Sequence, residues 1–137
     1  MGVNVTLLRE SFGLVIERQP QVVHRFYQIL FERYPKARPL FSRNSPAKQE
    51  EMLGAALVAV LDHLEDAAWL TDTLKAMGAK HVDYGVTGEM FGWVGDSLLA
   101  TLAEVAGPAW TPELAAAWTE AYGAISGLMQ MGAAERS

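Results

Sequence analysis

The sequence contains no cysteine, and this absence removes several kinds of chemistry at once. Without thiols, the chain can form no disulfide framework, no zinc site with thiolate ligands and no thiol nucleophile. It also lacks the glycine-rich loops and the G-x-S-x-G motif that mark nucleotide sites and serine hydrolases. A thiol enzyme and a nucleotide- or flavin-binding enzyme are therefore not indicated.

Positive charge is also scarce, because 11 Lys and Arg residues stand against 16 Asp and Glu residues, for a formal net charge of −5. A nucleic-acid-binding protein needs many cations against phosphates, so we exclude nucleic acid as a partner. The first residues lack the basic and then apolar pattern of a secretion signal, and no apolar run reaches the length of a membrane span. We therefore expect a cytoplasmic protein with no membrane partner.

What the chain does have is hydrophobic residues at helical spacing. They make up 50% of its 137 residues, and they recur every three or four positions, which is the period of one face of a helix. There is no strand alternation, no internal repeat and no linker. The sequence therefore predicts an all-α protein with one domain over residues 1–137 and about seven helical segments around one core.

Capping residues, prolines and glycines set the expected helix boundaries. The helical segments are expected at about 4–18, 21–34, 36–41, 46–64, 66–85, 87–107 and 111–132, with a short polar tail over 133–137. The candidate caps are Asn4 or Thr6, Asn44 or Ser45, and Asp66 or Thr71. Pro20 is expected in the first turn of the second helix, and Gly85 is expected to end the fifth segment.

The segment that ends at Gly85 has one apolar face, and that face ends in His81. Leu70, Leu74 and Met77 precede the histidine at steps of three or four residues. An imidazole at the end of an apolar face needs partners for its ring nitrogens. The partner of His81 is either a backbone carbonyl or buried water, as in an ordinary core, or a metal ion held in an apolar pocket.

Three further residues stand out from their surroundings. Tyr27 and Gln49 are polar residues on otherwise apolar faces of two other helices, and Phe41 is an aromatic residue outside any periodic pattern. Each has an ordinary explanation: a core tyrosine bonded to a carbonyl, a first-turn glutamine that points to solvent, and a residue that fills a corner. Met77 likewise serves more often as core filler than as a ligand. Taken singly, none of these residues indicates a function.

The order in which the residues occur is more specific than any one of them. Along the chain come Phe26-Tyr27, Arg38-Pro-Leu-Phe41, Gln49 with Leu53, Lys80-His81, Gly85-Val86, Trp118 and Ala121-Tyr122-Gly123. This order resembles the globin family, above all the bacterial haemoglobins and the haem domain of flavohaemoglobins, with some likeness to neuroglobins over 94–99 and 107–112. The resemblance covers nearly the whole chain. It implies a globin fold, with helices packed three over three around a haem pocket.

By this resemblance, the cofactor is haem b, and His81 is the proximal ligand of its iron, with a backbone carbonyl on the other ring nitrogen. Tyr27 and Gln49 form the distal polar pair that stabilises bound oxygen, and they carry any catalysis. Phe41 stacks on the porphyrin, and Leu53 lines the distal side of the pocket. The other expected cofactor contacts are Met77, Val86 and Phe91.

The function that the resemblance implies is reversible binding of diatomic gases, chiefly oxygen, as in oxygen transport, with nitric oxide and carbon monoxide as further ligands. One alternative is a nitric oxide dioxygenase or scavenger, which needs a separate reductase because the 137 residues hold no reductase domain. Another is a haem-based gas or redox sensor. A monomer and a homodimer are both compatible with the small residues on the helix faces.

The chain departs from flavohaemoglobins at two positions on the proximal side. In those proteins a tyrosine and a glutamate bond to the proximal histidine, whereas the matching residues here are Phe91 and Ala133. Neither side chain can form a hydrogen bond with an imidazole. Glu135 lies two residues beyond and is expected to face elsewhere. The resemblance therefore favours gas binding over a strongly activated peroxidase-like or dioxygenase site.

Overall fold

The computed structural model describes residues 4–41 and 45–136. Within these ranges the chain forms six α-helices and two 3-10 helices and contains no strand. The elements are α1 (Val5–Arg18), α2 (Val22–Arg33), η1 (Pro35–Phe41), α3 (Pro46–Asp62), α4 (Ala67–Asp83), α5 (Gly88–Ala106), η2 (Gly107–Ala109) and α6 (Pro112–Arg136). The expected all-α architecture is therefore confirmed.

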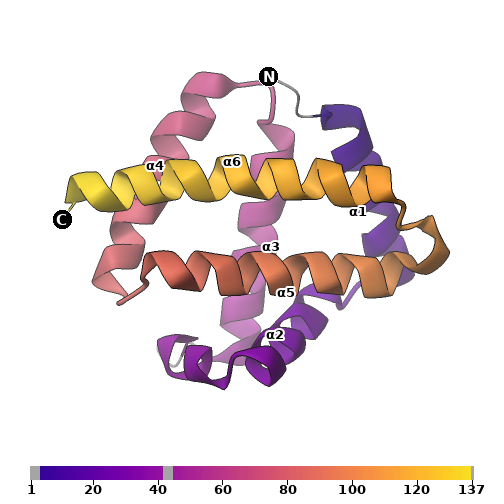
Figure 1. The fold of residues 1–137 in the computed structure, drawn as a ribbon, viewed down its shortest axis with the longest axis horizontal. Helices are drawn as coiled ribbons and strands as arrows, with labels where there is room; N and C mark the ends of the chain where they lie inside the picture. The colour runs from indigo at the N-terminus through magenta and orange to yellow at the C-terminus, as the bar shows by residue number, and fades with distance from the viewer. Residues whose placement is uncertain (1–3, 42–44, 137) are drawn as a thin grey trace.

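The helices cross one another rather than forming a parallel bundle. α5 and α6 lie side by side across one face of the molecule, and α3 and α4 cross behind them (Figure 1). α4 packs most extensively on α6, and α2 packs on α5. In the described ranges, α3 and α4 have no extensive contact with each other. The apolar faces of α3 and α4 therefore pack mainly on other elements, and they are only partly covered.

Side-chain caps confirm three of the expected helix starts. The caps are Asn4, Ser45 and Asp66, whose side-chain oxygens accept the backbone N–H groups of Leu7, Lys48 and Trp69 at 3.0, 3.2 and 3.0 Å. Each cap satisfies a donor that the start of a helix leaves free. The alternative caps Thr6 and Thr71 lie inside helices. Asn44 lies outside the described residues.

Two expected boundaries are wrong. Pro20 lies in a turn before α2, because the N–H of Val22 donates to the carbonyl of Gln19 and the helix begins only at Val22. The polar tail expected over 133–137 is helical as far as residue 136. α6 continues because it stays packed on α4, where Glu135 forms an ion pair with Lys75 at 2.7 Å. Glu135 therefore faces Lys75.

Gly85 stops the helical conformation after α4, as expected. Its φ of +84° lies in the left-handed region, which glycine adopts without a steric cost. The N–H groups of Gly85 and Val86 donate to the carbonyls of Val82 and His81, each at 3.0 Å. This reversal brings Val86 against the apolar side chains of α4 and α5.

Buried apolar side chains form two clusters. The larger cluster joins α1, α2, α5 and α6 and includes Leu8, Phe26, Leu30, Leu102 and Trp118. The smaller cluster consists of Val60, Leu74, Phe91 and Met129, from α3, α4, α5 and α6. Most apolar residues of α3 and α4 are half-buried or exposed: α3 buries Val60 alone, and α4 buries only Leu74 and Gly78. Part of their apolar surface is therefore open to a further group.

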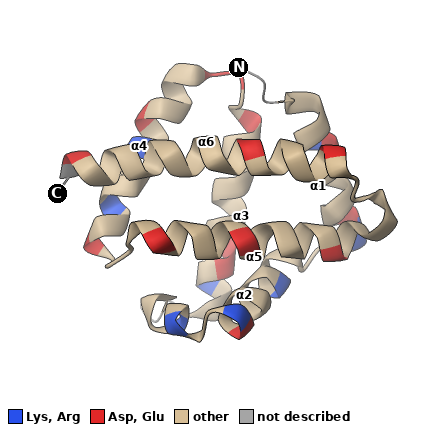
Figure 2. Ribbon diagram, viewed as in Figure 1, with Lys and Arg blue, Asp and Glu red and all other residues tan. Residues whose placement is uncertain are grey.

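Charge is unevenly distributed over the fold (Figure 2). α5 carries three acidic residues and no basic one. η1 carries Lys36 and Arg38 and no acidic residue. None of the described helices is both long and apolar enough to cross a membrane.

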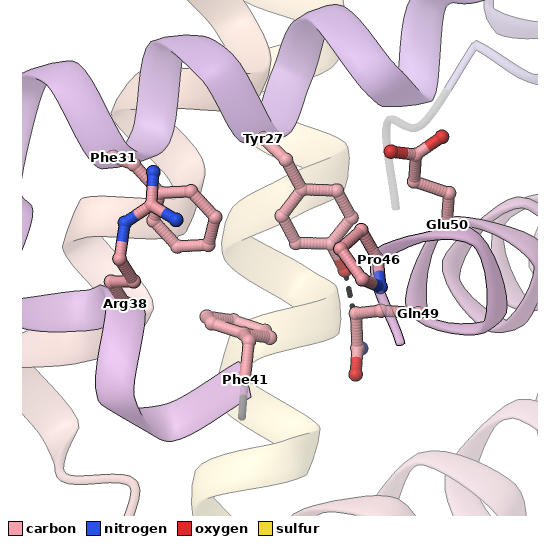
Figure 3. Close-up of a pocket in the computed structure, with 7 residues that line it drawn as sticks. All are labelled: Tyr27, Phe31, Arg38, Phe41, Pro46, Gln49 and Glu50. Carbon is pink, nitrogen blue, oxygen red and sulfur yellow. Dashed lines mark hydrogen bonds between the residues drawn. The ribbon is translucent and has the colours of Figure 1, made fainter. Parts of the chain in front are cut away.

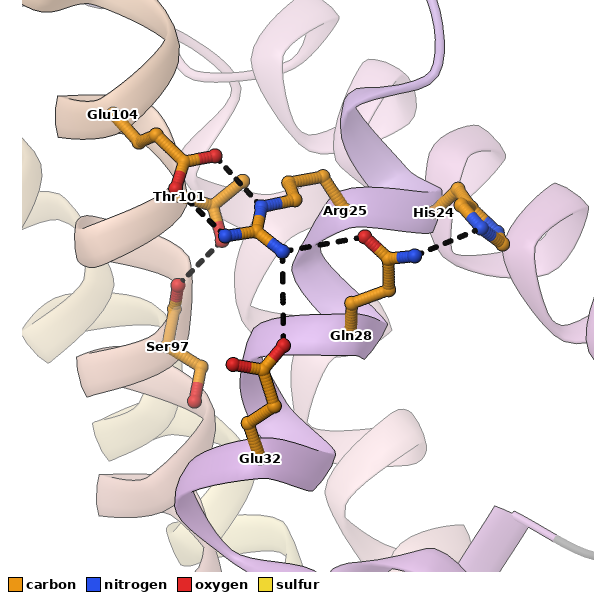
Figure 4. Close-up of polar contacts among 7 residues, drawn as sticks. All are labelled: His24, Arg25, Gln28, Glu32, Ser97, Thr101 and Glu104. Atoms are coloured by element: carbon orange, nitrogen blue, oxygen red, sulfur yellow. Dashed lines mark hydrogen bonds and ion pairs between the residues drawn. The ribbon is translucent and has the colours of Figure 1, made fainter.

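Polar side chains join α2 to α5 above a buried hydroxyl (Figure 4). The guanidinium of Arg25 donates two hydrogen bonds to the carboxylate of Glu104, at 2.7 and 2.8 Å.

Ser97 and Thr101 of α5 are fully buried, and the Thr101 hydroxyl donates to the Ser97 carbonyl at 2.7 Å. The Ser97 hydroxyl has no partner among the described residues. A buried hydroxyl without a partner destabilises the fold.

We expect Ser97→Ala to raise the free energy of unfolding by about 1 kcal/mol, because the variant removes the unpaired hydroxyl and places a better helix former in α5. Urea unfolding of the two proteins measures the difference. Ser126→Ala in α6 is the control, since Ser126 is only half-buried and its replacement adds about 0.5 kcal/mol from helix propensity alone. An equal increase in the free energy of unfolding of both variants would show that the unpaired Ser97 hydroxyl does not destabilise the fold.

Candidate functional site

A pocket of about 250 Å³ lies where α2, η1 and α3 meet (Figure 3). Its lining residues are Tyr27, Phe31, Arg38, Phe41, Pro46, Gln49 and Glu50. Three of the residues singled out from the sequence, Tyr27, Phe41 and Gln49, therefore converge on one cavity from three different elements. The wall is mainly apolar with a few polar groups, which is the usual composition of a small-molecule site.

The two uncharged polar side chains of this pocket, Tyr27 and Gln49, contact each other. The amide Nε2 of Gln49 donates a hydrogen bond to the Tyr27 hydroxyl oxygen at 3.2 Å. The recorded partner of Tyr27 is therefore Gln49 and not a backbone carbonyl, and Gln49 is half-buried and does not point freely to solvent. Because the Tyr27 oxygen accepts this bond, its own proton remains available to a further acceptor in the pocket.

Burial keeps the Tyr27 hydroxyl protonated. Removal from water raises its pKa to about 12, an effect that the hydrogen bond from Gln49 opposes and the charge of Glu50 reinforces. The residue is 7% exposed. Tyr27 is therefore a neutral hydrogen-bond donor over the whole physiological pH range.

This shift predicts a loss of stability at alkaline pH. Below pH 10 the hydroxyl is protonated in both the folded and the unfolded chain, whereas between pH 10 and 12 only the unfolded chain releases the proton. The free energy of unfolding should therefore fall across this interval by about 2–3 kcal/mol on account of Tyr27. Urea unfolding at several pH values measures this fall.

Tyr27→Phe is expected to lose that part of the pH dependence. A smaller fall should remain in the variant, because burial also raises the pKa of Tyr122. If wild type and variant lost equal stability between pH 10 and 12, the shift would not belong to Tyr27.

Phe41 lies at the end of η1 among other aromatic rings. Its ring centroid is 5.3 Å from that of Tyr27 and 5.7 Å from that of Phe31, both in edge-to-face geometry. Such pairs restrict the ring positions beyond the effect of burial alone. The corner residue predicted from the sequence is therefore a half-buried part of the pocket wall.

His81 is held at the end of α4 by a contact within its own helix. Its Nδ1 lies 2.6 Å from the carbonyl oxygen of Met77, one turn earlier. A carbonyl only accepts, so Nδ1 carries the hydrogen and Nε2 of the neutral ring keeps its lone pair. Nε2 has no hydrogen-bond partner among the described residues. The imidazole is half-buried, with the ring of Phe91 6.4 Å away and that of Tyr84 5.7 Å away.

The carbonyl contact does not by itself choose between a core histidine and a ligand, because both interpretations predict it. The unused Nε2 lone pair is the more informative feature, since an imidazole nitrogen with a free lone pair is a good ligand for a transition metal. No group of three or more metal-ligating side chains occurs in the part of the chain that the structure describes. The described residues therefore do not offer enough ligands to bind a free metal ion. His81 is suited to an ion whose other ligands come from a cofactor.

The candidate residues fall into two groups. The first group, Tyr27, Phe41, Gln49 and Leu53, lies on or beside the larger cluster around the pocket. The second group consists of His81 with Met77, Val86 and Phe91, whose apolar members belong to the smaller cluster. Leu64, in the turn after α3, packs against both clusters. The structure thus brings together the members of each group and records no direct contact between His81 and Tyr27.

Comparison with known proteins settles the family. The globin family model matches residues 24–129, which span both groups of candidate residues. The chain belongs to the globin family. A flavohemoprotein of Rhodopirellula baltica is 31% identical to this globin over 124 residues, which are 89% of this chain and 30% of that protein. This globin therefore spans less than a third of the length of that relative.

Solved structures support the same fold. An engineered carbene transferase made from a proposed nitric oxide dioxygenase of Rhodothermus marinus is 29% identical to this globin, with a TM-score of 0.82 over 96% of this chain and 91% of the other. A bacterial globin of Campylobacter jejuni is 21% identical, with a TM-score of 0.80 over 96% and 94% of the two chains, which shows the shared fold alone. The predicted globin fold is confirmed.

Membership of the globin family implies a haem cofactor, and the residues of this structure fit one. Haem needs one axial ligand from the protein and a large apolar surface around its ring. His81 offers a free Nε2 lone pair. Phe41, Leu53, Met77 and Val86 offer half-buried apolar side chains that a flat apolar group would cover.

Some lining residues were missed by the sequence argument. Phe31 lies four residues after Tyr27, so helical spacing alone places both on one face of α2. Glu50 follows Gln49, and nothing in the sequence indicates that its carboxylate would meet His24 of α2 at 2.7 Å. That contact depends on how α2 and α3 cross.

Proposed function

We propose that this globin binds haem b and reversibly binds diatomic gases, chiefly oxygen. The observation that carries the proposal is the convergence of a protonated Tyr27 hydroxyl and the Gln49 amide on one apolar pocket. Bound haem would supply the iron at which gas ligands bind, and His81 would hold that iron through Nε2. The carbonyl of Met77 keeps Nδ1 protonated and fixes the orientation of the ring.

The remaining side chains act on the gas ligand and on water. The Tyr27 hydroxyl has a free proton and can donate to a ligand atom that carries partial negative charge, while Gln49 holds the hydroxyl in place. Phe41 and Leu53 supply apolar surface that excludes water. Oxygen gains more from such a donor than carbon monoxide, which carries less charge on its outer atom.

The first experiment is the absorption spectrum of the purified protein after haem addition, reduced, with and without oxygen. We expect a Soret band that shifts when oxygen is admitted. Tyr27→Phe should then raise the oxygen dissociation rate about tenfold or more, because it removes a hydrogen bond worth roughly 1.5–3 kcal/mol, and should change carbon monoxide dissociation much less. A protein that takes up no haem would contradict the proposal.

The second candidate function is nitric oxide dioxygenation with a separate reductase. It is favoured by the likeness to flavohemoproteins and to the proposed dioxygenase of Rhodothermus marinus. It is disfavoured by Phe91, which offers His81 an apolar ring and no hydrogen-bonding group. Nitrate formation with an added reductase distinguishes the two functions. Repeated turnover supports the enzyme, whereas one nitrate per haem leaves only a stoichiometric scavenger.

A further inference from the structure

The pocket beside Tyr27 carries two charged residues on an otherwise uncharged wall. Arg38 of η1 and Glu50 of α3 are the charged residues that line it, and they stand at opposite ends of the group of side chains in Figure 3. Between them lie Tyr27, Phe41 and Gln49. The pocket therefore has a cation at one end and a carboxylate at the other.

Among the described residues, Arg38 has no acidic partner. The guanidinium carbon of Arg38 lies 4.7 Å from the centroid of the Phe31 ring, a cation–π contact that holds the charge over the pocket wall. Arg38 forms no ion pair with any acid in the described ranges. Its positive charge is therefore not cancelled locally.

The carboxylate is engaged on the far side of the pocket. Nδ1 of His24 lies 2.7 Å from Oε2 of Glu50, and the Glu50 side chain is 23% exposed. The amide of Gln28 in turn approaches Nε2 of His24 at 3.4 Å, so the imidazole is held toward Glu50 (Figure 4). One carboxylate oxygen of Glu50 is thus paired with His24 of α2, whereas the guanidinium of Arg38 is paired with no acid among the described residues.

Arg38 is an exposed residue, so solvent partly screens its charge. Phe31, Phe41 and Pro46 line the pocket with apolar groups, which offer a ligand no competing charge. The whole chain has a formal net charge of −5, which by itself repels anions. Local attraction at this pocket must therefore come from Arg38 and its basic neighbours on η1.

We propose that Arg38 is a specificity-determining residue that makes this pocket favour small monovalent anions over neutral nitrogen ligands. The inference rests on the proposed haem function, because it concerns ligands that reach the cofactor through this pocket. Arg38 attracts the anion by its charge. The Tyr27 hydroxyl and the Gln49 amide then donate hydrogen bonds inside the pocket.

The test compares one anion with one neutral ligand in the ferric holoprotein. Azide and imidazole are titrated at pH 8 and low ionic strength, and the affinity ratio of azide to imidazole is read from the Soret band. Arg38→Gln should lower this ratio about fivefold to tenfold, and Glu50→Gln should raise it, since the amide keeps an acceptor for His24 but loses the negative charge. Both changes should shrink in about 0.5 M salt, where the Debye length is only a few ångströms.

Arg33→Gln is the matched control. Arg33 is an exposed cation of the same region, it lies outside the pocket lining, and its replacement should leave the ratio unchanged. An affinity ratio that stays constant in Arg38→Gln would overturn the inference. An equal loss of affinity for both ligands together with a loss of haem would also overturn it, because Arg38 would then act by holding the cofactor. A protein without a Soret band would instead overturn the proposed function, and this inference with it.

Discussion

Replacing His81 with alanine is expected to lower the affinity for haem by about 100-fold or more, because it removes the only nitrogen ligand that the second group of candidate residues offers. In the structure, His81 presents Nε2 with a free lone pair, and Met77 holds Nδ1 at 2.6 Å. No neighbouring side chain of that group can take over as a nitrogen ligand, since Met77, Val86 and Phe91 are apolar. Titration of the haem-free protein with haem measures the affinity.

His63→Ala is a closely matched control. His63 is also half-buried near the end of a helix, and its Nδ1 lies 2.7 Å from the carbonyl of Ala59, four residues earlier. Its ring stacks on Trp69 with a centroid distance of 3.8 Å. The two histidines thus share the same backbone contact, and only His81 is expected to bind iron. Either of two results would contradict the role of His81 as the iron ligand. One is equal haem affinity in His81→Ala and wild type, and the other is an equal loss of haem affinity in His81→Ala and His63→Ala.

Added imidazole gives a second measurement on the same variant. A free imidazole fits the space that the His81 side chain leaves and can supply the missing nitrogen. Haem binding by His81→Ala should therefore recover in millimolar imidazole, while a variant that had merely lost its fold would not respond.

Replacing Gly78 with alanine is expected to lower the free energy of unfolding by about 3 kcal/mol, or the Tm by about 10 °C, because α4 and α6 approach too closely for a side chain at this position. A methyl group on Gly78 would overlap the carbonyl oxygen of Met129, and one on Gly132 would overlap the carbonyl oxygen of Lys75. Each helix thus contributes one glycine to the contact. Because these neighbours are backbone atoms, they cannot move aside without separating the helices.

The same variant should also weaken haem binding. Gly78 lies three residues before His81 on the same helix, so a displacement of α4 moves the imidazole as well. Thermal unfolding and haem titration of Gly78→Ala measure the two effects. The control is Gly92→Ala in α5, where a methyl group meets nothing within 4 Å, and which should stabilise the helix by up to about 1 kcal/mol. An equal free energy of unfolding in Gly78→Ala and wild type would show that α4 and α6 can move apart without a loss of stability.

The two effects have different origins, and comparing haem-free with haem-bound protein distinguishes them. His81→Ala should leave the stability of the haem-free protein nearly unchanged, since the imidazole makes one backbone contact and is half-buried. Gly78→Ala should destabilise the haem-free protein directly. Bound haem adds stability in proportion to its affinity, so only proteins that bind it should unfold at a higher temperature in its presence.

The sequence narrowed the caps of α3 and α4 to two candidates each and placed the helix end at Gly85. Ser45 and Asp66 cap their helices, and Gly85 ends the last turn before the chain reverses, because each depends on the backbone within a few residues. The contact of His81 with Met77 is local in the same sense, since it joins two residues on one turn of α4. Helical spacing also placed Met77 and His81 on one face. The all-α class followed from the number of such faces, and the globin fold from the resemblance carried by the order of Tyr27, Phe41, Gln49 and His81.

Only the tertiary structure decided how those faces meet. Gln49 contacts Tyr27 across 22 positions of sequence, and Glu50 meets His24, because α3 crosses α2 at that point. α6 is helical as far as residue 136, and near its end Glu135 forms an ion pair with Lys75 of α4. Helix caps and periods depend on neighbours within one or two turns. Pair contacts between helices depend on which small residues let two backbones approach, and no local pattern in one helix specifies its partner.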